Sequence, residues 1–168
     1  RLDEIWNDLD FRRVWYSDKQ RDQAEKMVNK SRAGHNRPEA RDVVSVEESF
    51  ALDLGRVVIR GRVDRAERDD QGRAWIVDIK TSSSHVREED LARHPQLGVY
   101  QLAVMLGAFA DKGLIEPGGA ELIQVGKGAY SARVRVQTQG PPSADDDPEW
   151  PRKLVDRVAE GMANPVFT

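Results

Sequence analysis

The sequence predicts an α/β protein of the α+β type, in which three consecutive antiparallel strands begin a sheet and helices flank it. From Val43 the apolar residues recur at every second position, the period of a strand. Before this point and near the C-terminus they recur at the spacing of one helix face. The length of 168 residues suits one domain. We expect this domain to contain a helical lead-in (1–42), a sheet and helix core (43–138), a linker (139–147) and a terminal helix with its tail (148–168).

The composition is that of a globular protein. Charged residues make up 33% and the hydrophobic set 39%, and no apolar run approaches the roughly 18 residues of a membrane span. The chain has no cysteine, which excludes disulfides and thiolate metal sites within it and allows the cytoplasmic location that we predict. A net charge of -3 counts mildly against a free-standing nucleic-acid-binding module, because such modules usually carry a basic excess.

The elements follow in order along the chain. Residues 2–9 have the spacing of a helix, and Ser17 with Gln20 fits the capping box of a second helix that ends near Gly34. The sequence then predicts strands over 43–54, 56–66 and 73–81, a helix over 93–113, strands over 120–125 and 132–137, and a last helix from near Pro148. In the long helix, Pro95 lies in the first turn and Gly113 just past the end.

The stretch "RGRVDRAERDDQGRAWIVDIKT" places acidic and basic residues inside strands that otherwise have apolar residues. Because side chains alternate along a strand, Asp78 and Lys80 share one face, about 7 Å apart. If residues 70–72 form a three-residue hairpin loop, with Gly72 at positive φ, Asp64 lies directly across from Asp78 on the neighbouring strand. A loop one residue longer or shorter would break this match.

Two facing carboxylates repel each other, and a divalent cation would relieve the repulsion. Oxygen ligands suit Mg²⁺ or Mn²⁺, so we expect Asp64, Asp78 and the Ile79 carbonyl to be ligands. Lys80 would then orient or help deprotonate a water, or offset charge on a pentavalent phosphorane. The inferred reaction is metal-assisted phosphodiester hydrolysis. On spacing alone, a solvated cross-strand ion pair is the better interpretation, because exposed pairs are common and weakly consequential.

Three segments, "GRVDR", "IVDIKT" and "QLGVY", resemble in order and spacing the signature segments of the RecB-like branch of the PD-(D/E)XK nuclease superfamily. The amino-acid sequence of these segments is most similar to that of the nuclease domains of actinobacterial helicase-nucleases of the AddAB/AdnAB type. The resemblance implies a restriction-endonuclease-like core with a central mixed sheet. It also implies that Asp64 and Asp78 bind the metal, that Lys80 is the catalytic lysine, and that Gln96 and Tyr100 belong to the site. Ordinary helix packing remains the alternative for this last pair.

The same resemblance implies partners: the ends of double-stranded or unwound single-stranded DNA, and a helicase motor in the same parent chain or in a partner subunit. The motor must lie elsewhere, because a phosphate-binding "GxxxxGK[ST]" loop is absent from this chain. Glu47 occupies a place where relatives often have a glutamate, although a solvated strand residue is the simpler interpretation.

The sequence departs from the family in two places. Relatives commonly have a histidine ligand in a "G-x-x-x-H" setting, which is missing here, and His35 is a poor substitute. Many relatives also hold an iron-sulfur cluster with four cysteines, which this chain cannot supply. The chain begins with arginine, so we expect a piece of a longer parent that binds metal weakly by itself. A natural, partly degenerate nuclease is the other account.

The sequence also allows two other functions. The chain could be a catalytically inactive DNA-binding or partner-docking module, with local positive charge from Arg56, Arg60, Arg62, Arg65 and Arg68. It could also be a hydrolase in which a serine of "TSSSH" pairs with His85, although adjacent loop residues rarely present that geometry.

Overall fold

The computed structural model describes residues 41–81, 86–125 and 135–163. Both helices expected before residue 41, the "SSSH" part of the proposed hydrolase loop and the turn over 126–131 lie outside these ranges. The described elements are β1 (Asp42–Asp53), β2 (Val58–Arg68), β3 (Ala74–Lys80), α3 (Glu88–Leu91), α4 (Pro95–Met105), η1 (Ala110–Lys112), β4 (Pro117–Gln124), β5 (Arg135–Gln139), η2 (Pro142–Ala144) and α5 (Trp150–Ala163).

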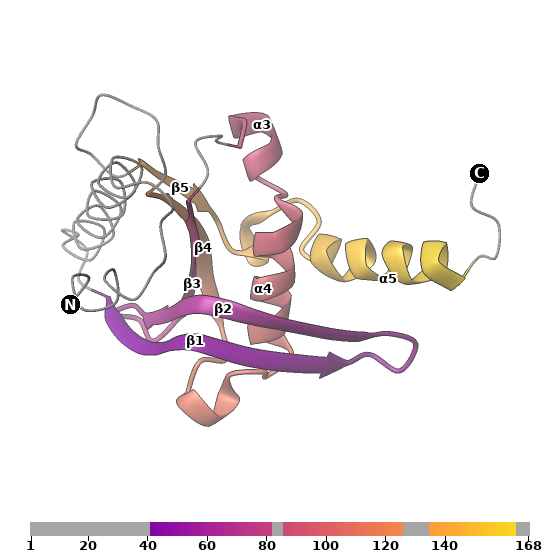
Figure 1. Cartoon of the computed structure of the whole chain (residues 1–168), viewed down its shortest axis with the longest axis horizontal. Helices are drawn as coiled ribbons and strands as arrows, with labels where there is room; N and C mark the ends of the chain where they lie inside the picture. Colours follow the sequence, from indigo (N-terminus) through magenta and orange to yellow (C-terminus); the bar gives the residue numbers. More distant parts are fainter. Residues whose placement is uncertain (1–40, 82–85, 126–134, 164–168) are drawn as a thin grey trace, which may run out of the picture.

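The strands form one five-stranded sheet in the order β1-β2-β3-β4-β5. Strands β1, β2 and β3 are antiparallel neighbours, as the meander predicted. Strand β4 then runs parallel to β3, and β5 runs antiparallel to β4. The connection from β3 to β4 contains α3 and α4, because parallel neighbours need a long crossover. Figure 1 shows α4 packed on one side of the sheet, between the sheet and α5.

The loop between β2 and β3 has the predicted three residues. The Asp69 amide donates a hydrogen bond to the Arg73 carbonyl at 3.0 Å, and Gly72 has φ of 80°. The Asp69 carboxylate also accepts a hydrogen bond from the Arg73 amide at 2.8 Å. This loop sets the register in which Arg65 lies opposite Val77. The predicted pair of Asp64 and Asp78 lies one residue beyond the last paired residues of the two strands.

Strand β2 stays with β1 for longer than it stays with β3. Its pairing with β3 ends at Arg65 and Val77, whereas its pairing with β1 continues to Val58. The outer part of the β1–β2 hairpin therefore leaves the sheet and extends past α4 towards α5 (Figure 1). The point where β2 separates from β3, called the strand fork below, lies between Asp64 and Asp78.

The core lies between the sheet and α4. Buried residues from the sheet, α4 and the segment after it form one cluster: Phe50, Leu52, Val63, Ala66, Ala74, Ile76, Leu97, Tyr100, Ala103, Val104, Phe109, Leu114, Ala120 and Leu122. The opposite face holds a smaller apolar cluster around Val77 and Ile123. It also holds a buried charged group in which Arg41 pairs with Glu67 and Glu121.

The long predicted helix ends earlier than expected. Helix α4 stops at Met105, and the predicted end at Gly113 is wrong. Gly107 has φ of 80°, its amide donates to the Val104 carbonyl, and the Ala108 amide donates to the Ala103 carbonyl. This is the Schellman pattern, in which a left-handed glycine closes a helix. Gly113 closes the short η1 in the same left-handed conformation.

The C-terminal part is more ordered than a linker. Strand β5 extends to Gln139, which is 1% exposed, and η2 follows it. Helix α5 begins at Trp150, close to the predicted start, and buries Trp150, Pro151 and Val155. None of the helices in the described ranges is long and apolar enough to cross a membrane.

Candidate active site

Asp64 lies at the strand fork and binds the backbone of β3. Its Oδ2 atom accepts a hydrogen bond from the Ile79 amide at 2.6 Å. That amide would have bonded to β2 if the two strands had stayed paired, so the carboxylate replaces a lost ladder bond. The N–H and C=O of one strand residue point to the same neighbouring strand. The Ile79 carbonyl therefore faces the same gap as Asp64.

Asp78 and Lys80 lie on one face of β3, as the strand alternation predicted. The Lys80 ammonium is 2.7 Å from Asp78 Oδ2. Asp78 is 4% exposed, whereas the Lys80 side chain is 34% exposed. No hydrogen bond to Asp78 Oδ2 is formed within the described residues, so this buried oxygen is balanced by the ion pair. A buried carboxylate next to a more accessible ammonium is therefore the centre of the site.

Gln96, in the first turn of α4, joins the site to the helix. Its Oε1 accepts a hydrogen bond from Lys80 at 2.8 Å. Its Nε2 donates to Asp78 Oδ1 at 2.9 Å and to the Tyr100 hydroxyl at 2.7 Å. Gln96 and Tyr100 are four residues apart and so share a helix face. The structure thus brings together the five residues that the resemblance assigns to the site: Asp64, Asp78, Lys80, Gln96 and Tyr100.

Tyr100 closes the site on the core side. Its ring is buried and meets Phe50 edge to face, with ring centres 6.1 Å apart. Its hydroxyl donates to the Arg62 carbonyl of β2 at 3.3 Å. Burial, and then the charges of Asp78 and Asp64, raise the pKa of Tyr100 above 10.0, although the hydrogen bond from Gln96 opposes the rise. The hydroxyl therefore stays protonated and ties α4 to β2.

His94 is a neighbour of the site that the sequence interpretation missed. It precedes Pro95 at the N-terminus of α4, and its Nδ1 is buried without a hydrogen bond from the described residues. Burial and then the Lys80 charge lower the pKa of His94 below 6.5, while Asp78 raises it. The signal in the sequence was its position, two residues before Gln96.

Two glutamines of β5 hold the segment that carries His94. The Gln139 amide donates to the carbonyls of Leu91 at 2.9 Å and His94 at 3.3 Å. The Gln137 side chain bonds both backbone groups of Val86, donating at 2.6 Å and accepting at 3.1 Å. These two side chains act as backbone substitutes, because an amide can donate and accept as a peptide group does. They fix the segment between β3 and α4, and nothing local in the sequence marked them.

Glu47 lies apart from the cluster. Its carboxylate pairs with Arg62 at 3.0 Å, and both side chains are more than half exposed, at 59% and 63%. Its backbone has φ of 52°, a left-handed value that is uncommon for a residue other than glycine. The pairs on either side of it are Val46 with Arg65 and Glu48 with Val63, so this distortion lies where β1 faces Asp64.

The residues at the fork fit a hard divalent cation. Asp64 and Asp78 supply carboxylate oxygens from facing strands, one oxygen of Asp78 lacks a hydrogen bond, and the Ile79 carbonyl faces the gap. Oxygen donors of this kind suit Mg²⁺ or Mn²⁺. Across 41–81, 86–125 and 135–163, no three acidic or histidine side chains gather as metal ligands. Waters or phosphate oxygens would therefore complete the coordination.

The sequence was compared with protein families, curated proteins and solved structures. The sequence matches the PD-(D/E)XK nuclease superfamily over residues 1–168. A crystal structure of SSO0001 is 20% identical, with 92% of this chain and 72% of that chain covered and a TM-score of 0.42. No curated protein matches the sequence. The mixed five-stranded sheet flanked by helices is consistent with the restriction-endonuclease-like fold, so the predicted fold class is confirmed. The chain belongs to the PD-(D/E)XK nuclease superfamily.

Proposed function

We propose that this chain is a Mg²⁺- or Mn²⁺-dependent DNA nuclease domain of the RecB-like branch. The observation that carries the proposal is the strand fork, where two carboxylates from facing strands lie beside one lysine. Asp64 is bound to the Ile79 amide at 2.6 Å, and Lys80 is 2.7 Å from Asp78. Asp78 is 4% exposed, and a second carboxylate close to a buried one is costly without a cation. Membership of a nuclease superfamily supports the same chemistry.

Each residue has a role in this proposal. Asp64, Asp78 and the Ile79 carbonyl hold the cation, which, when bound, polarises a phosphate and makes a neighbouring water more acidic. Lys80 has the exposure needed to approach that phosphate or water, and its charge offsets the negative charge that develops on the phosphate. Gln96 orients Lys80 and Asp78 together through its two amide atoms. Tyr100 holds Gln96 in place from the core side.

The larger setting of the proposal rests on the "GRVDR", "IVDIKT" and "QLGVY" segments. We infer that the domain works in a cytoplasmic helicase-nuclease of the AddAB/AdnAB type, on the ends of double-stranded or unwound DNA. The motor would lie in the same parent chain or in a partner subunit. Any iron-sulfur cluster of such a parent takes its cysteines from outside this chain, which has none.

Cleavage of linear DNA tests the proposal. With Mn²⁺ or Mg²⁺ the chain is expected to cut DNA, and Asp78→Ala or Lys80→Ala should each reduce the rate by about 100-fold or more. The matched control is Lys153→Ala, because Lys153, which lies on α5, forms an exposed ion pair with Asp147. Gel analysis of end-labelled DNA measures the rates. Cleavage that survives both site substitutions would remove the proposed site.

A catalytically inactive DNA-binding or partner-docking module is the second candidate. It is favoured by the way protein groups already satisfy the carboxylates: Asp64 binds a backbone amide, and Asp78 binds Gln96 and Lys80. Calorimetric titration with Mn²⁺ separates the two functions. A nuclease should bind Mn²⁺ at a site that Asp64→Ala weakens. Flat heats at millimolar Mn²⁺, together with DNA binding that needs no metal, would favour the inactive module.

A further inference from the structure

An apolar groove opens beside the active site. It has a volume of about 390 Å³ and is enclosed by the β1–β2 hairpin, α4 and α5. The residues that line it are Val57, Ile59, Pro95, Gln96, Val99, Tyr100, Leu154, Val155 and Val158. Apart from Gln96 and Tyr100, all of these side chains are aliphatic. This volume lies within the range of about 300–1,000 Å³ that is usual for small-ligand pockets.

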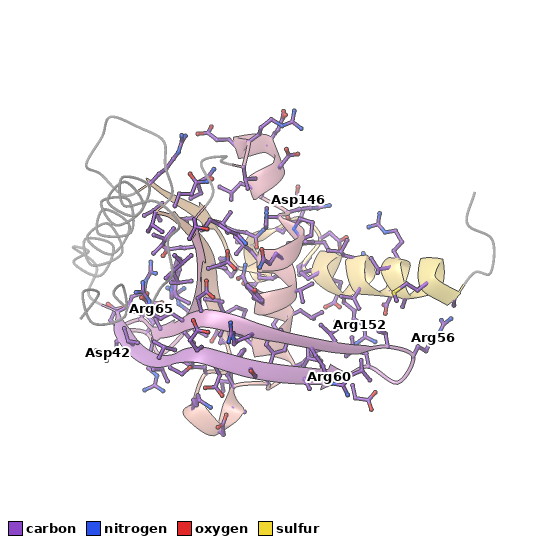
Figure 2. All side chains as sticks on the ribbon, in the orientation of Figure 1. Asp42, Arg56, Arg60, Arg65, Asp146 and Arg152 are labelled. Atoms are coloured by element: carbon purple, nitrogen blue, oxygen red, sulfur yellow. The ribbon has the colours of Figure 1, made fainter. Side chains whose placement is uncertain are left out.

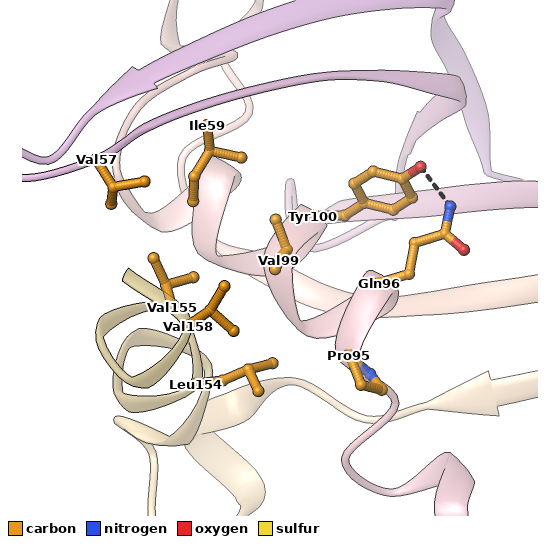
Figure 3. Close-up of a pocket in the computed structure, with 9 residues that line it drawn as sticks. All are labelled: Val57, Ile59, Pro95, Gln96, Val99, Tyr100, Leu154, Val155 and Val158. Atoms are coloured by element: carbon orange, nitrogen blue, oxygen red, sulfur yellow. Dashed lines mark hydrogen bonds between the residues drawn. The ribbon is translucent and has the colours of Figure 1, made fainter. Parts of the chain in front are cut away.

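The groove exists because two elements project beyond the core. The outer β1–β2 hairpin has left the sheet, and α5 is buried only through its first turns, at Trp150, Pro151 and Val155. Val158, one turn further along α5, remains 55% exposed on the wall of the groove. Figure 3 shows Val57 and Ile59 on one side of this space and Leu154, Val155 and Val158 on the other.

The groove and the active site share a wall. Gln96 and Tyr100 line the groove, and the polar atoms of the same two side chains contact Asp78. Figure 3 shows these two residues at one end of the groove, joined by their hydrogen bond. A ligand in the groove would therefore lie next to any phosphate held at Asp64 and Asp78.

Positive charge lies beside the walls of the groove. Arg56 precedes Val57 at the end of the hairpin, and Arg157 precedes Val158 on α5. Both side chains are exposed. Arg152, also on α5, pairs with Asp156 at 3.2 Å. Figure 2 shows Arg56 and Arg152 at the same end of the molecule. Guanidinium groups beside an apolar space suit a strand that carries both phosphates and bases.

We propose that the groove binds an unpaired nucleobase of the DNA strand whose phosphate lies at Asp64 and Asp78. Apolar walls bind the faces of a base, whereas the arginines bind the backbone on either side. A base inside a duplex is stacked and paired, so it cannot enter a groove of this shape without leaving the helix. The occupant is therefore an unpaired nucleotide. This inference rests on the proposed nuclease function.

Binding without metal tests the groove separately from cleavage. Fluorescence anisotropy in EDTA would compare a labelled thymidine decanucleotide with an abasic deoxyribose-phosphate chain of the same length and nearly the same charge. The wild-type chain should bind the thymidine strand about fivefold to tenfold more tightly, because apolar contact with bases adds affinity. Val57→Asn combined with Val158→Asn should reduce that preference to below about twofold.

A matched double variant controls for general effects of asparagine. Val43→Asn combined with Met162→Asn also changes one valine of the hairpin strands and one residue of α5. Val43 and Met162 are 47% and 74% exposed and lie outside the groove. This variant should keep the wild-type preference for bases. Thermal unfolding of both variants would confirm that each remains folded.

The outcomes distinguish this inference from the proposed function. If the wild-type chain cuts DNA with Mn²⁺ yet binds the abasic strand as tightly as the thymidine strand, the base-binding groove is wrong and the nuclease stands. Equal base preference in the two double variants would also overturn it, and would leave the groove as a surface for a protein partner. If no DNA is cut, the nuclease proposal fails, while the binding comparison still reports on the groove.

Discussion

At the scale of single residues, the site depends on one amide that satisfies three partners. Gln96 accepts from Lys80 and donates to Asp78 and Tyr100. Exchanging its amide oxygen and nitrogen would place the oxygen against the Asp78 carboxylate and the NH₂ group against the Lys80 ammonium. A glutamate in its place would bring a second carboxylate against Asp78, which is unfavourable. The amide therefore sets where the lysine lies relative to the buried carboxylate.

His94 provides a probe of this arrangement that needs no metal. Since the Lys80 charge opposes protonation of His94, Lys80→Met should raise the pKa of His94, whereas Asp78→Asn should lower it. NMR titration of the imidazole measures both shifts, and His94→Gln identifies its signal. Lys112→Met is the control, because Lys112 pairs with Glu48 and Asp111 away from the site. An unchanged pKa in Lys80→Met would contradict the placement of His94 next to Lys80.

The lowered pKa of His94 makes the stability of the protein depend on pH. Burial holds the pKa of His94 below its usual 6.5, so the folded protein favours the neutral ring. Its contribution to the free energy of unfolding is therefore present above pH 6.5 and is lost as the pH falls through the folded pKa. His94→Gln should remove this part of the acid sensitivity.

At the scale of elements, the groove depends on how closely α5 approaches α4. Gly98 of α4 lies against the indole of Trp150, and a Cβ at this position would overlap the ring. Trp150 is 6% exposed and forms the main anchor of α5. A glycine is needed here for close approach, not for an unusual backbone angle.

Gly98→Ala should therefore weaken the docking of α5. We expect the free energy of unfolding to fall by about 1–3 kcal/mol, because the added methyl group overpacks the contact. Gly161→Ala is the matched control, since Gly161 lies in α5 with open space around its Cβ position. That change should be neutral or stabilising by about 0.5–1 kcal/mol. Urea denaturation measures the free energy of unfolding of both variants. Equal values would show that the packing of Trp150 does not depend on its contact with Gly98.

At the scale of the whole molecule, the sheet separates the active site from a buried charged group. The active site lies on the α4 side, and the other side holds Glu67, which is 2.7 Å from Arg65 and 3.4 Å from Arg41. Arg41 also lies over the ring of Trp75, 3.6 Å from its centre. Groups on this side can affect stability without touching the reacting atoms.

Glu67→Ala tests this separation. Removing Glu67 takes one ion-pair partner from Arg65 and one from Arg41, which keeps Glu121, so the free energy of unfolding should fall by about 3 kcal/mol. The rate of DNA cleavage per folded molecule should remain that of the wild type. Glu89→Ala is the control, because Glu89 pairs with Arg87 at the surface and its loss should cost less than about 1 kcal/mol. A cleavage rate that falls with Glu67→Ala would show that the two faces are coupled.

Features that depend on local pattern could be predicted from the amino-acid order alone. The turn at 70–72 was enough to set the register that pairs Arg65 with Val77, next to Asp64 and Asp78, and strand alternation was enough to put Lys80 on the face of Asp78. Helical spacing was enough to put Gln96 and Tyr100 on one face. These inferences succeeded because each depends on residues close together in the chain, where backbone geometry alone fixes the relation between side chains.

Features that depend on distant contacts became visible only in the folded structure. Helix α4 ends at Met105 because Gly107, and not Gly113, closes it while the next residues enter the core. The hydrogen bonds from Gln139 to the segment before α4 join residues more than 40 positions apart. The separation of β2 from β3 decides that Asp64 meets Ile79. The aliphatic groove depends on how far the hairpin and α5 project from the core. Local periodicity carries no information about such contacts, because they depend on packing between elements that are distant in the sequence.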